Sequence, residues 1–347
     1  MSNIQINPYN FAVPAGLGSW KELDRTVLTS ESNTITVSGL DSKQYLMVLT
    51  QGKTAQTNAD LSFRFNGDSA TNYASRQKWD GGGSDYVLTN QTHYRPLGTV
   101  QDLQFLNIDY ISNQSTQEKL VIGSASDNKA AGSGTPPTRE EHVAKWANTS
   151  SALNQVQALL VNGTPNFRVG SEVVVLGYDP TDVHTTTDNF WQELKSTELG
   201  STNGTLDSGT FTAKKYLCVQ VYLNANSAVE QRMRFNLDSA SNYSFRFSSN
   251  GATDGTAIND SNMLIGDGGI TTPSFTNMFI INNSGNEKLV LSNNIYQNTA
   301  GSGTAPSRFE ANNKWSNTSS QITSIQLFNA SGGVYQAGSI IKVWGHD

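Results

Sequence analysis

The residue types that most often do acid–base chemistry or bind metals are few and scattered in this chain. Its four histidines follow neither an HxxxH nor an HxH spacing. A zinc site or a catalytic triad needs several such groups around one point. We therefore predict surface histidines without a catalytic or metal role. They are His93, His142, His184 and His346.

An internal duplication provides a comparison for every candidate residue. The segment Trp20–Asp179 returns, diverged, as Trp191–Asp347. None of the histidines matches a histidine in the other copy, so what the chain repeats is architecture. The best matches pair KWANTSS at Lys145–Ser151 with KWSNTSS at Lys314–Ser320, AGSGT at Ala131–Thr135 with Ala300–Thr304, and RFNGDSATNY at Arg64–Tyr73 with RFNLDSASNY at Arg234–Tyr243.

Carboxylates that recur in both copies are the remaining candidates for acid–base catalysis. A glycosidase needs two of them about 5–10 Å apart, and the sequence leaves that distance open. Glu118 lies in EKL and Glu141 follows Arg139 closely, which predicts ion-paired or turn-anchoring groups. Asp68 lies in FNGDS, where Asn and Asp side chains bond backbone amides and shape tight turns. We therefore predict no enzyme active site. The recurring pairs are Glu22/Glu193, Asp68/Asp238, Glu118/Glu287, Glu141/Glu310 and Asp179/Asp347.

Two other kinds of residue are candidates for ligand binding. The glycine–aspartate loops Asp80–Asp85 and Gly266–Gly269 offer oxygen ligands but lack the spaced acidic residues of an EF-hand. Because the copies also differ there, we assign no metal and no cofactor. Trp79 and Tyr86 flank the first loop and occur in one copy only, so we predict them as ligand or partner contacts. The tryptophans shared by both copies are assigned to the fold: Trp20 with Trp191, and Trp146 with Trp315.

Composition narrows the class of protein further. Charged residues make up 15% of the chain, against about 25% in ordinary soluble proteins. The net charge is −6 and no basic patch stands out, which argues against a nucleic-acid partner. The single cysteine, Cys218, is predicted to be a buried strand residue. The N-terminus has no signal peptide pattern, and no segment reaches the ~18 apolar residues of a membrane span; we expect synthesis in a cytosol.

The elements that position these residues are predicted to be strands. Apolar and polar residues alternate at Thr34–Val37, Leu61–Phe65 and Leu106–Tyr110, and glycine-rich turns separate such runs. We expect roughly eight short strands per copy. The predicted fold class is all-β, with two tandem jelly-roll-like β-sandwich domains that arise from internal duplication.

The duplication also sets the predicted domain boundaries. We predict an extended N-terminal arm at residues 1–18, a first β-sandwich at 19–180, a linker at 181–190 and a second β-sandwich at 191–347. The arm carries scattered apolar residues, among them Tyr9 and Phe11. It is either a segment that docks on a neighbouring molecule, with Tyr9 and Phe11 as contacts, or a disordered tail.

The repeated motifs resemble a domain that recurs in virion proteins of tailed bacteriophages. The resemblance covers most of both copies and implies a virion component without catalytic residues, such as capsid decoration, a fibre or a tail-associated part. It also implies a homo-oligomer, most often a trimer, with major capsid or tail proteins as further partners. The motifs are Arg64–Tyr73, Lys145–Val156 and Gly170–Gly177, and in the second copy Arg234–Tyr243, Lys314–Ile325 and Gly338–Gly345.

Three functions remain open at this level. The first is a capsid decoration or auxiliary protein located in the virion and made in the host cytoplasm. The alternative is a tail- or fibre-associated protein that binds a receptor or a host-surface glycan, with Trp79 and Tyr86 in its groove. An enzyme such as a depolymerase has the least support, because no acid–base constellation recurs.

Overall fold

The computed structural model describes residues 20–56, 58–163, 165–180, 182, 188–225, 228–297, 299 and 301–347. The predicted arm, with Tyr9 and Phe11, lies outside the described residues, as does most of the predicted linker. Within the described part of the chain, no helix is long and apolar enough to cross a membrane.

The first copy folds as a β-sandwich of one eight-stranded and one four-stranded sheet. Every pairing in both sheets is antiparallel. The strands are β1 (Lys21–Val27), β2 (Thr34–Ser38), β3 (Tyr45–Gly52), β4 (Ala59–Phe65), β5 (Tyr73–Trp79), β6 (Tyr86–Gln91), β7 (Tyr94–Val100), β8 (Phe105–Ser112), β9 (Lys119–Asp127), β10 (Glu140–Trp146), β11 (Gln155–Val161) and β12 (Glu172–Tyr178).

The second copy repeats this arrangement strand for strand, again with an eight-stranded and a four-stranded sheet. Its strands are β13 (Gln192–Glu198), β14 (Thr205–Asp207), β15 (Tyr216–Leu223), β16 (Gln231–Phe235), β17 (Tyr243–Ser249), β18 (Gly255–Asp260), β19 (Met263–Leu264), β20 (Ser274–Ile281), β21 (Lys288–Tyr296), β22 (Ser307–Trp315), β23 (Ile325–Asn329) and β24 (Ile340–His346).

The strand order is that of a jelly roll with additions. Strands β1-β12-β3-β8 lie in the larger sheet and β2-β11-β4-β7 form the smaller one. The chain therefore winds between the two sheets as in an eight-stranded jelly roll. Strands β9, β10, β5 and β6 then widen the larger sheet beyond β8. The predicted all-β duplicated sandwich is confirmed, and each copy carries four strands more than the eight that we expected.

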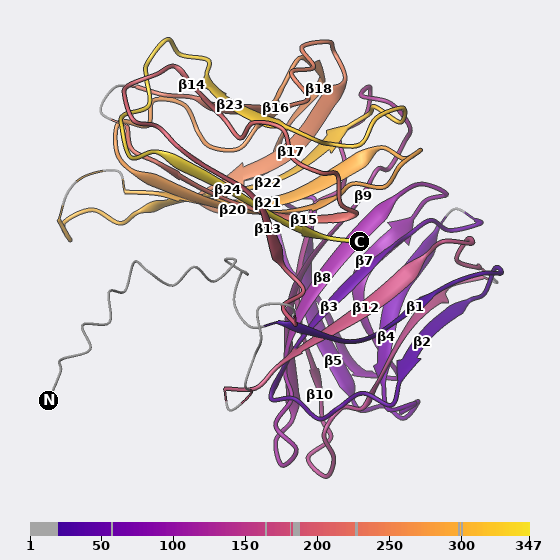
Figure 1. Ribbon diagram of the computed structural model, residues 1–347. Coiled ribbons are helices and arrows are strands. Elements are labelled where there is room, and N and C mark those ends of the chain that lie inside the picture. Colours follow the sequence, from indigo (N-terminus) through magenta and orange to yellow (C-terminus); the bar gives the residue numbers. More distant parts are fainter. Residues whose placement is uncertain are drawn as a thin grey trace, which may run out of the picture.

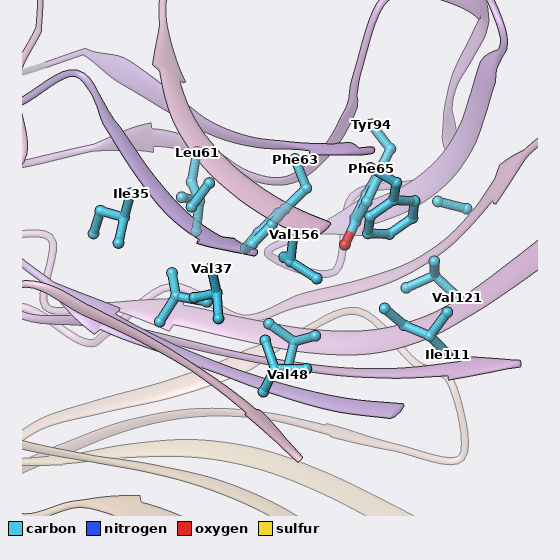
Figure 2. Close-up of a cluster of buried hydrophobic side chains, with 14 of the residues drawn as sticks. Ile35, Val37, Val48, Leu61, Phe63, Phe65, Tyr94, Ile111, Val121 and Val156 are labelled. Atoms are coloured by element: carbon cyan, nitrogen blue, oxygen red, sulfur yellow. The ribbon is translucent and has the colours of Figure 1, made fainter. Parts of the chain in front are cut away.

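Alternating side chains build the core of each sandwich. In β4, Leu61, Phe63 and Phe65 point between the sheets and are fully buried. Figure 2 shows them facing Val48 of β3 and side chains of β8 and β9 across the sandwich. Burying each such side chain contributes about 1.5–3 kcal/mol. Because alternate residues of a strand point to the same face, the apolar–polar alternation determines which face of each sheet packs against the other.

The predicted aspartate turn is present in both copies. Asp68 accepts hydrogen bonds from the Ala70 amide at 2.9 Å, the Asn72 side chain at 2.8 Å and the Trp146 indole at 2.7 Å. The turn around Asp238 repeats all three bonds at 2.9, 2.8 and 2.7 Å. Asp68 and Asp238 thus tie the turn before β5 and β17 to the tryptophan of the KW motif, which confirms a structural role for these residues.

The two sandwiches meet through their larger sheets. Figure 1 shows the first sandwich in purple and magenta and the second in orange and yellow, with β2 and β14 on the sides that face away from the junction. A hydrophobic cluster separate from both sandwich cores fills the junction. The outer face of each eight-stranded sheet is therefore the part of the molecule that decides how domains associate.

Candidate assembly surface

Each eight-stranded sheet has an outer face with two distinct ends. We call one the tryptophan end, because it begins at Trp20 in the first domain and Trp191 in the second. We call the other the loop end, because the loop between β9 and β10, or between β21 and β22, leaves from it. Because neighbouring strands pair side by side, residues of several strands line up at each end of the sheet. Each end is therefore a row of side chains that crosses the strands.

The junction joins the loop end and the middle of the first domain's outer face to the tryptophan end and the middle of the second domain's outer face. The first domain contributes apolar side chains of β3, β8 and β12, and the second contributes apolar side chains of β15, β20, β21, β24 and the residues directly before β13. These residues are buried, so the contact is as dry as a domain core. They are Met47, Leu49, Leu106, Ile108, Val174 and Leu176 from the first domain, and Phe190, Trp191, Tyr216, Cys218, Ile281, Leu289, Leu291 and Trp344 from the second.

The β9–β10 loop of the first domain lies on the second sheet and is held through its backbone. Lys314 Nζ donates to the carbonyls of Asn128 at 3.1 Å and Ala130 at 2.7 Å. The Gly132 amide donates to Glu287 Oε1 at 2.5 Å. Burial lowers the pKa of Lys314 to about 8, which marks how far the loop excludes water.

Charged side chains complete the junction. Arg139 donates from Nη2 to Asp254 Oδ1 at 2.6 Å and from Nε to Oδ2 at 3.1 Å. This bidentate ion pair is nearly buried, with side-chain exposures of 5% for Arg139 and 1% for Asp254. At the other side Lys215 pairs with Glu172 at 2.8 Å. Buried, bidentate Arg–carboxylate pairs fix orientation as well as strength, so the relative placement of the two domains is well determined.

The tryptophan end of the first domain is open where its counterpart in the second is covered. Leu120 and Ile122 are 55% and 66% exposed, whereas the matching Leu289 and Leu291 are 0% and 3% exposed. Tyr45, Tyr110 and Val143 are exposed beside them. Trp20, Tyr45, Tyr110, Leu120 and Ile122 line a shallow apolar hollow, which continues toward Val87 and Val143.

The loop end of the second domain is open in the same way. Tyr222, Phe275 and Ile295 are exposed and lie side by side, because Phe275 pairs with Tyr222 on one side and Ile295 on the other. Arg308 follows opposite Ile295, and its side chain is 59% exposed. The chain therefore presents one open tryptophan end and one open loop end among its described residues.

The sequence-predicted contacts Trp79 and Tyr86 lie elsewhere. Trp79 ends β5 and is 46% exposed, and Tyr86 begins β6 and is 51% exposed. Tyr86 lies opposite the buried Gln77, and Trp79 follows Gln77 by two residues on the same strand. Trp79 and Tyr86 therefore point to the inner side of the sheet, away from the outer face that carries the tryptophan end. The guanidinium of Arg95 lies over the Tyr86 ring at 4.8 Å. No ring contact joins Trp79 to Tyr86 within the described chain.

A buried polar cluster in the first sandwich corrects one prediction from the sequence. His142 was expected at the surface, but it is buried and its Nε2 lies 2.6 Å from Asp109 Oδ1. Asp109 Oδ2 also accepts hydrogen bonds from Tyr94 at 3.0 Å and Asn107 at 2.7 Å. His142 alternates with Ala144 and Trp146, whose side chains face the core, and that period of two is the signal that sequence reasoning missed.

The cluster is closed to solvent. The side chains of His142 and Asp109 have no exposed area, and a Cβ atom at Gly123 would collide with both of them. Glycine at this position therefore leaves the space that the pair occupies. A histidine–aspartate pair polarises a nucleophile only when substrate reaches it, so this arrangement holds the core together.

The other predicted features have structural positions. His93 and His346 are partly buried rather than exposed, and His184 lies outside the described residues. Cys218 is buried in β15 as expected, and burial raises the pKa of its thiol. Asp80 in the glycine–aspartate loop accepts from the Arg139 amide at 2.9 Å. The part of the chain that the structure describes contains no group of three or more metal-ligating side chains.

Comparisons with known proteins add little to this geometry. No family model matches the chain, and no curated protein matches it. Among solved structures, the mouse laminin alpha1 chain domains LG4-5 are 10% identical, with 95% of this chain and 90% of that chain covered and a TM-score of 0.18. The attachment invasion locus protein Ail of Yersinia pestis is 10% identical, with 78% and 98% covered and a TM-score of 0.12. Similarities at these scores carry no argument about fold or function.

Proposed function

We propose that this chain is a non-enzymatic structural component of a tailed-phage virion, in particular a capsid decoration or auxiliary protein that binds the particle surface. The observation that carries the proposal is the open tryptophan end of the first domain. Monomeric proteins rarely expose large contiguous apolar patches, and such patches mark association sites. Exposed Tyr45, Tyr110, Leu120 and Ile122 form one on a rigid sheet.

The resemblance of the repeated motifs to phage virion domains supports the same proposal. The repeated residues with described contacts serve architecture. Asp68 and Asp238 bind turn amides and tryptophans, and Glu141 pairs with Arg139 as Glu310 pairs with Arg308. Partners in this proposal are other copies of the chain and major capsid or tail proteins.

Particle composition tests the proposal directly. Phage particles from the virus that encodes this chain are purified on a density gradient, and their proteins are quantified by mass spectrometry. We expect the chain in the particle, in a fixed ratio to the major capsid protein. A cryo-EM map of the same particles then locates two adjoining β-sandwiches per chain. Absence of the chain from infectious purified particles would overturn the proposal.

A second candidate function is binding of a receptor or host-surface glycan by a tail- or fibre-associated protein. It is favoured by the exposure of Trp79 and Tyr86, since sugars bind against aromatic faces. A glycan array with the intact chain tests it, using Trp79→Ser because Ser249 occupies the matching position in the second copy. Binding that the variant loses would support this function, and no binding to any host polysaccharide would exclude it.

A further inference from the structure

The junction between the two domains is heterologous: outside the middle of the two sheets, where the matching pairs Met47/Cys218 and Leu176/Trp344 both contribute, it uses the loop end of one domain and the tryptophan end of the other. Each copy carries both ends on one sheet. Forming the junction once therefore uses one loop end and one tryptophan end, and leaves one of each exposed. A heterologous contact of this kind can repeat from molecule to molecule.

The open loop of the second domain keeps the shape of the docked loop. In the docked loop, Asn128 N donates to Gln104 O at 3.1 Å and Ala130 N to Asn128 O at 2.5 Å. In the open loop, the matching bonds run from Gln297 N to Pro273 O at 3.2 Å and from Thr299 N to Gln297 O at 2.8 Å. The first glycine of the shared GSGT sequence also has the same left-handed backbone in both: φ is 79° at position 132 and 83° at position 301.

The loop keeps its sequence although nothing in the described chain covers it. Gly301–Thr304 are exposed, as is Pro306, whereas the matching Pro137 is buried against the second domain. The hydrogen bonds within the loop account for its shape, but they do not require the exposed residues to match those that the docked loop presents to the second domain. We take their retention as support for a docking partner of the open loop.

The groups that receive the docked loop also recur on the open tryptophan end. Lys314, which binds the loop carbonyls, matches Lys145, and Glu287, which accepts the Gly132 amide, matches Glu118. On the open face Lys145 pairs with Glu118 at 3.0 Å, and both side chains are about half exposed. Arg246, which donates to the Pro137 carbonyl at 3.2 Å, matches Arg76 in the same way.

The principal ion pair of the junction has a complementary counterpart among exposed residues. Arg139 matches Arg308 on the open loop end, and Asp254 matches Asp85, which directly precedes β6 at the side of the first sheet. Arg308 now pairs with its neighbour Glu310 at 3.1 Å, and Asp85 pairs with Arg76 at 3.1 Å. Within one chain both line a hollow at the domain junction. Exposed pairs like these are weak, so a new partner displaces them readily.

We propose that copies of this chain associate head to tail: the open loop end of the second domain in one copy covers the open tryptophan end of the first domain in the next. The contact repeats the one that joins the two domains within the chain. The inference rests on the proposed role as an assembly protein and names the occupant of the same open face. The chain closes into a ring or grows into a filament according to the rotation between successive domains.

The intermolecular junction is more polar than the internal one. Leu49, Ile108 and Val174 of the first domain match Gln220, Asn277 and Lys342 of the second. The open loop end keeps Tyr222, Phe275 and Ile295 as its apolar contacts. We therefore expect the copies to associate reversibly, while the two domains of one chain stay joined.

Charge reversal tests the proposal on the full chain. Mass is measured by sedimentation and light scattering over about 1–100 µM, a range that brackets reversible association. We expect oligomers for the natural chain, and a dissociation constant about 30-fold or more weaker for Arg308→Glu or for Asp85→Arg. Mixing the two variants restores assembly, because each contact then pairs opposite charges. The control Asp207→Arg, on the four-stranded sheet, leaves the mass unchanged.

Several outcomes would overturn the proposal. One is a monomer at every concentration with normal circular dichroism. Another is an oligomer whose mass ignores both reversals, and a third is reversals that change thermal stability alone, which would place the pair within one chain. If deletion of residues 1–18 abolishes assembly while Asp85→Arg does not, the arm occupies the site instead. Assembly in a protein absent from purified particles would defeat the virion role and leave this inference standing.

Discussion

The interiors of the two sandwiches differ in the side chains that fill two matching core positions. Beneath β8 and β10 the first domain buries Asp109 against His142, whereas the second places Met278 and Ala311 at the matching positions. The turn and tryptophan frame around these sites is the same to 0.1 Å in its hydrogen bonds. We infer that the fold depends on that frame, and that it accommodates either polar or apolar side chains at the two core positions.

The largest expected effect comes from breaking the polar cluster. Asp109→Met introduces the residue of the second copy and leaves His142, Tyr94 and Asn107 without their shared acceptor. Breaking a buried pair costs about 3–5 kcal/mol, and urea denaturation measures the loss. The double variant Asp109→Met/His142→Ala recovers part of it, because the second copy buries Met278 and Ala311 at those two positions. A single variant as stable as the natural chain would show that the cluster does not stabilise the first domain.

The next effect is a pH dependence that belongs to the first domain. Burial raises the pKa of Asp127 from 3.8 to about 7, and the matching residue in the second copy is Tyr296. Because the folded pKa exceeds the unfolded one, the contribution to stability is complete below about pH 4 and is lost as the pH rises through 7. At about 1.4 kcal/mol per unit, the loss is on the order of 4 kcal/mol. Thermal melts from pH 4 to 8 measure it, and Asp127→Asn makes the profile shallower, while the raised pKa values of Glu140, Glu287 and Glu310 leave a remaining slope. An unchanged slope in that variant would contradict the assignment.

A smaller effect tests the shared frame. Asp68→Ala and Asp238→Ala each remove three hydrogen bonds to a carboxylate that is only partly buried. We expect each to cost about 2 kcal/mol, in line with bonds to charged groups that water partly replaces. Equal losses of unfolding free energy in chemical denaturation would support a frame that stabilises both domains in the same way. Clearly unequal losses would contradict it.

The smallest effect compares the covered and open ends. Glu287→Ala removes the acceptor of the Gly132 amide at the junction and costs about 1–2 kcal/mol. Glu118→Ala breaks a half-exposed pair with Lys145 and changes stability by less than about 0.5 kcal/mol in the monomer. Denaturation at concentrations below assembly measures both. A large loss for Glu118→Ala under those conditions would mean that this end is not open in the isolated chain.

The fold was predictable because its determinants are local. Alternation at Leu61–Phe65 and the glycine-rich turns are read within a few residues, and FNGDS specifies the Asp68 turn by itself. The burial of Cys218 followed from its place in the apolar run YLCVQV, where it matches Met47 of the first copy. Each copy has twelve strands instead of the expected eight, because β5, β6, β9 and β10 are added to one side of the larger sheet. The other eight strands keep the jelly-roll order.

The assembly surface was not predictable from single strands, because it is made by rows of residues far apart in the chain. Val173–Leu176 is an unbroken apolar run, which is typical of a strand covered on both faces. That signal points to the junction, but it does not say what covers the outer face. His142 was missed for a related reason: its partner Asp109 and the space at Gly123 come from two other strands.

Joining two domains in one chain frees their contacts to evolve apart. In an assembly of identical single domains, each substitution would appear in every contact at once. Here Leu49, Ile108 and Val174 serve only the internal junction, while Gln220, Asn277 and Lys342 lie on the end that stays open. In the proposed head-to-tail assembly, selection can then make one contact permanent and keep the other reversible, within a single gene.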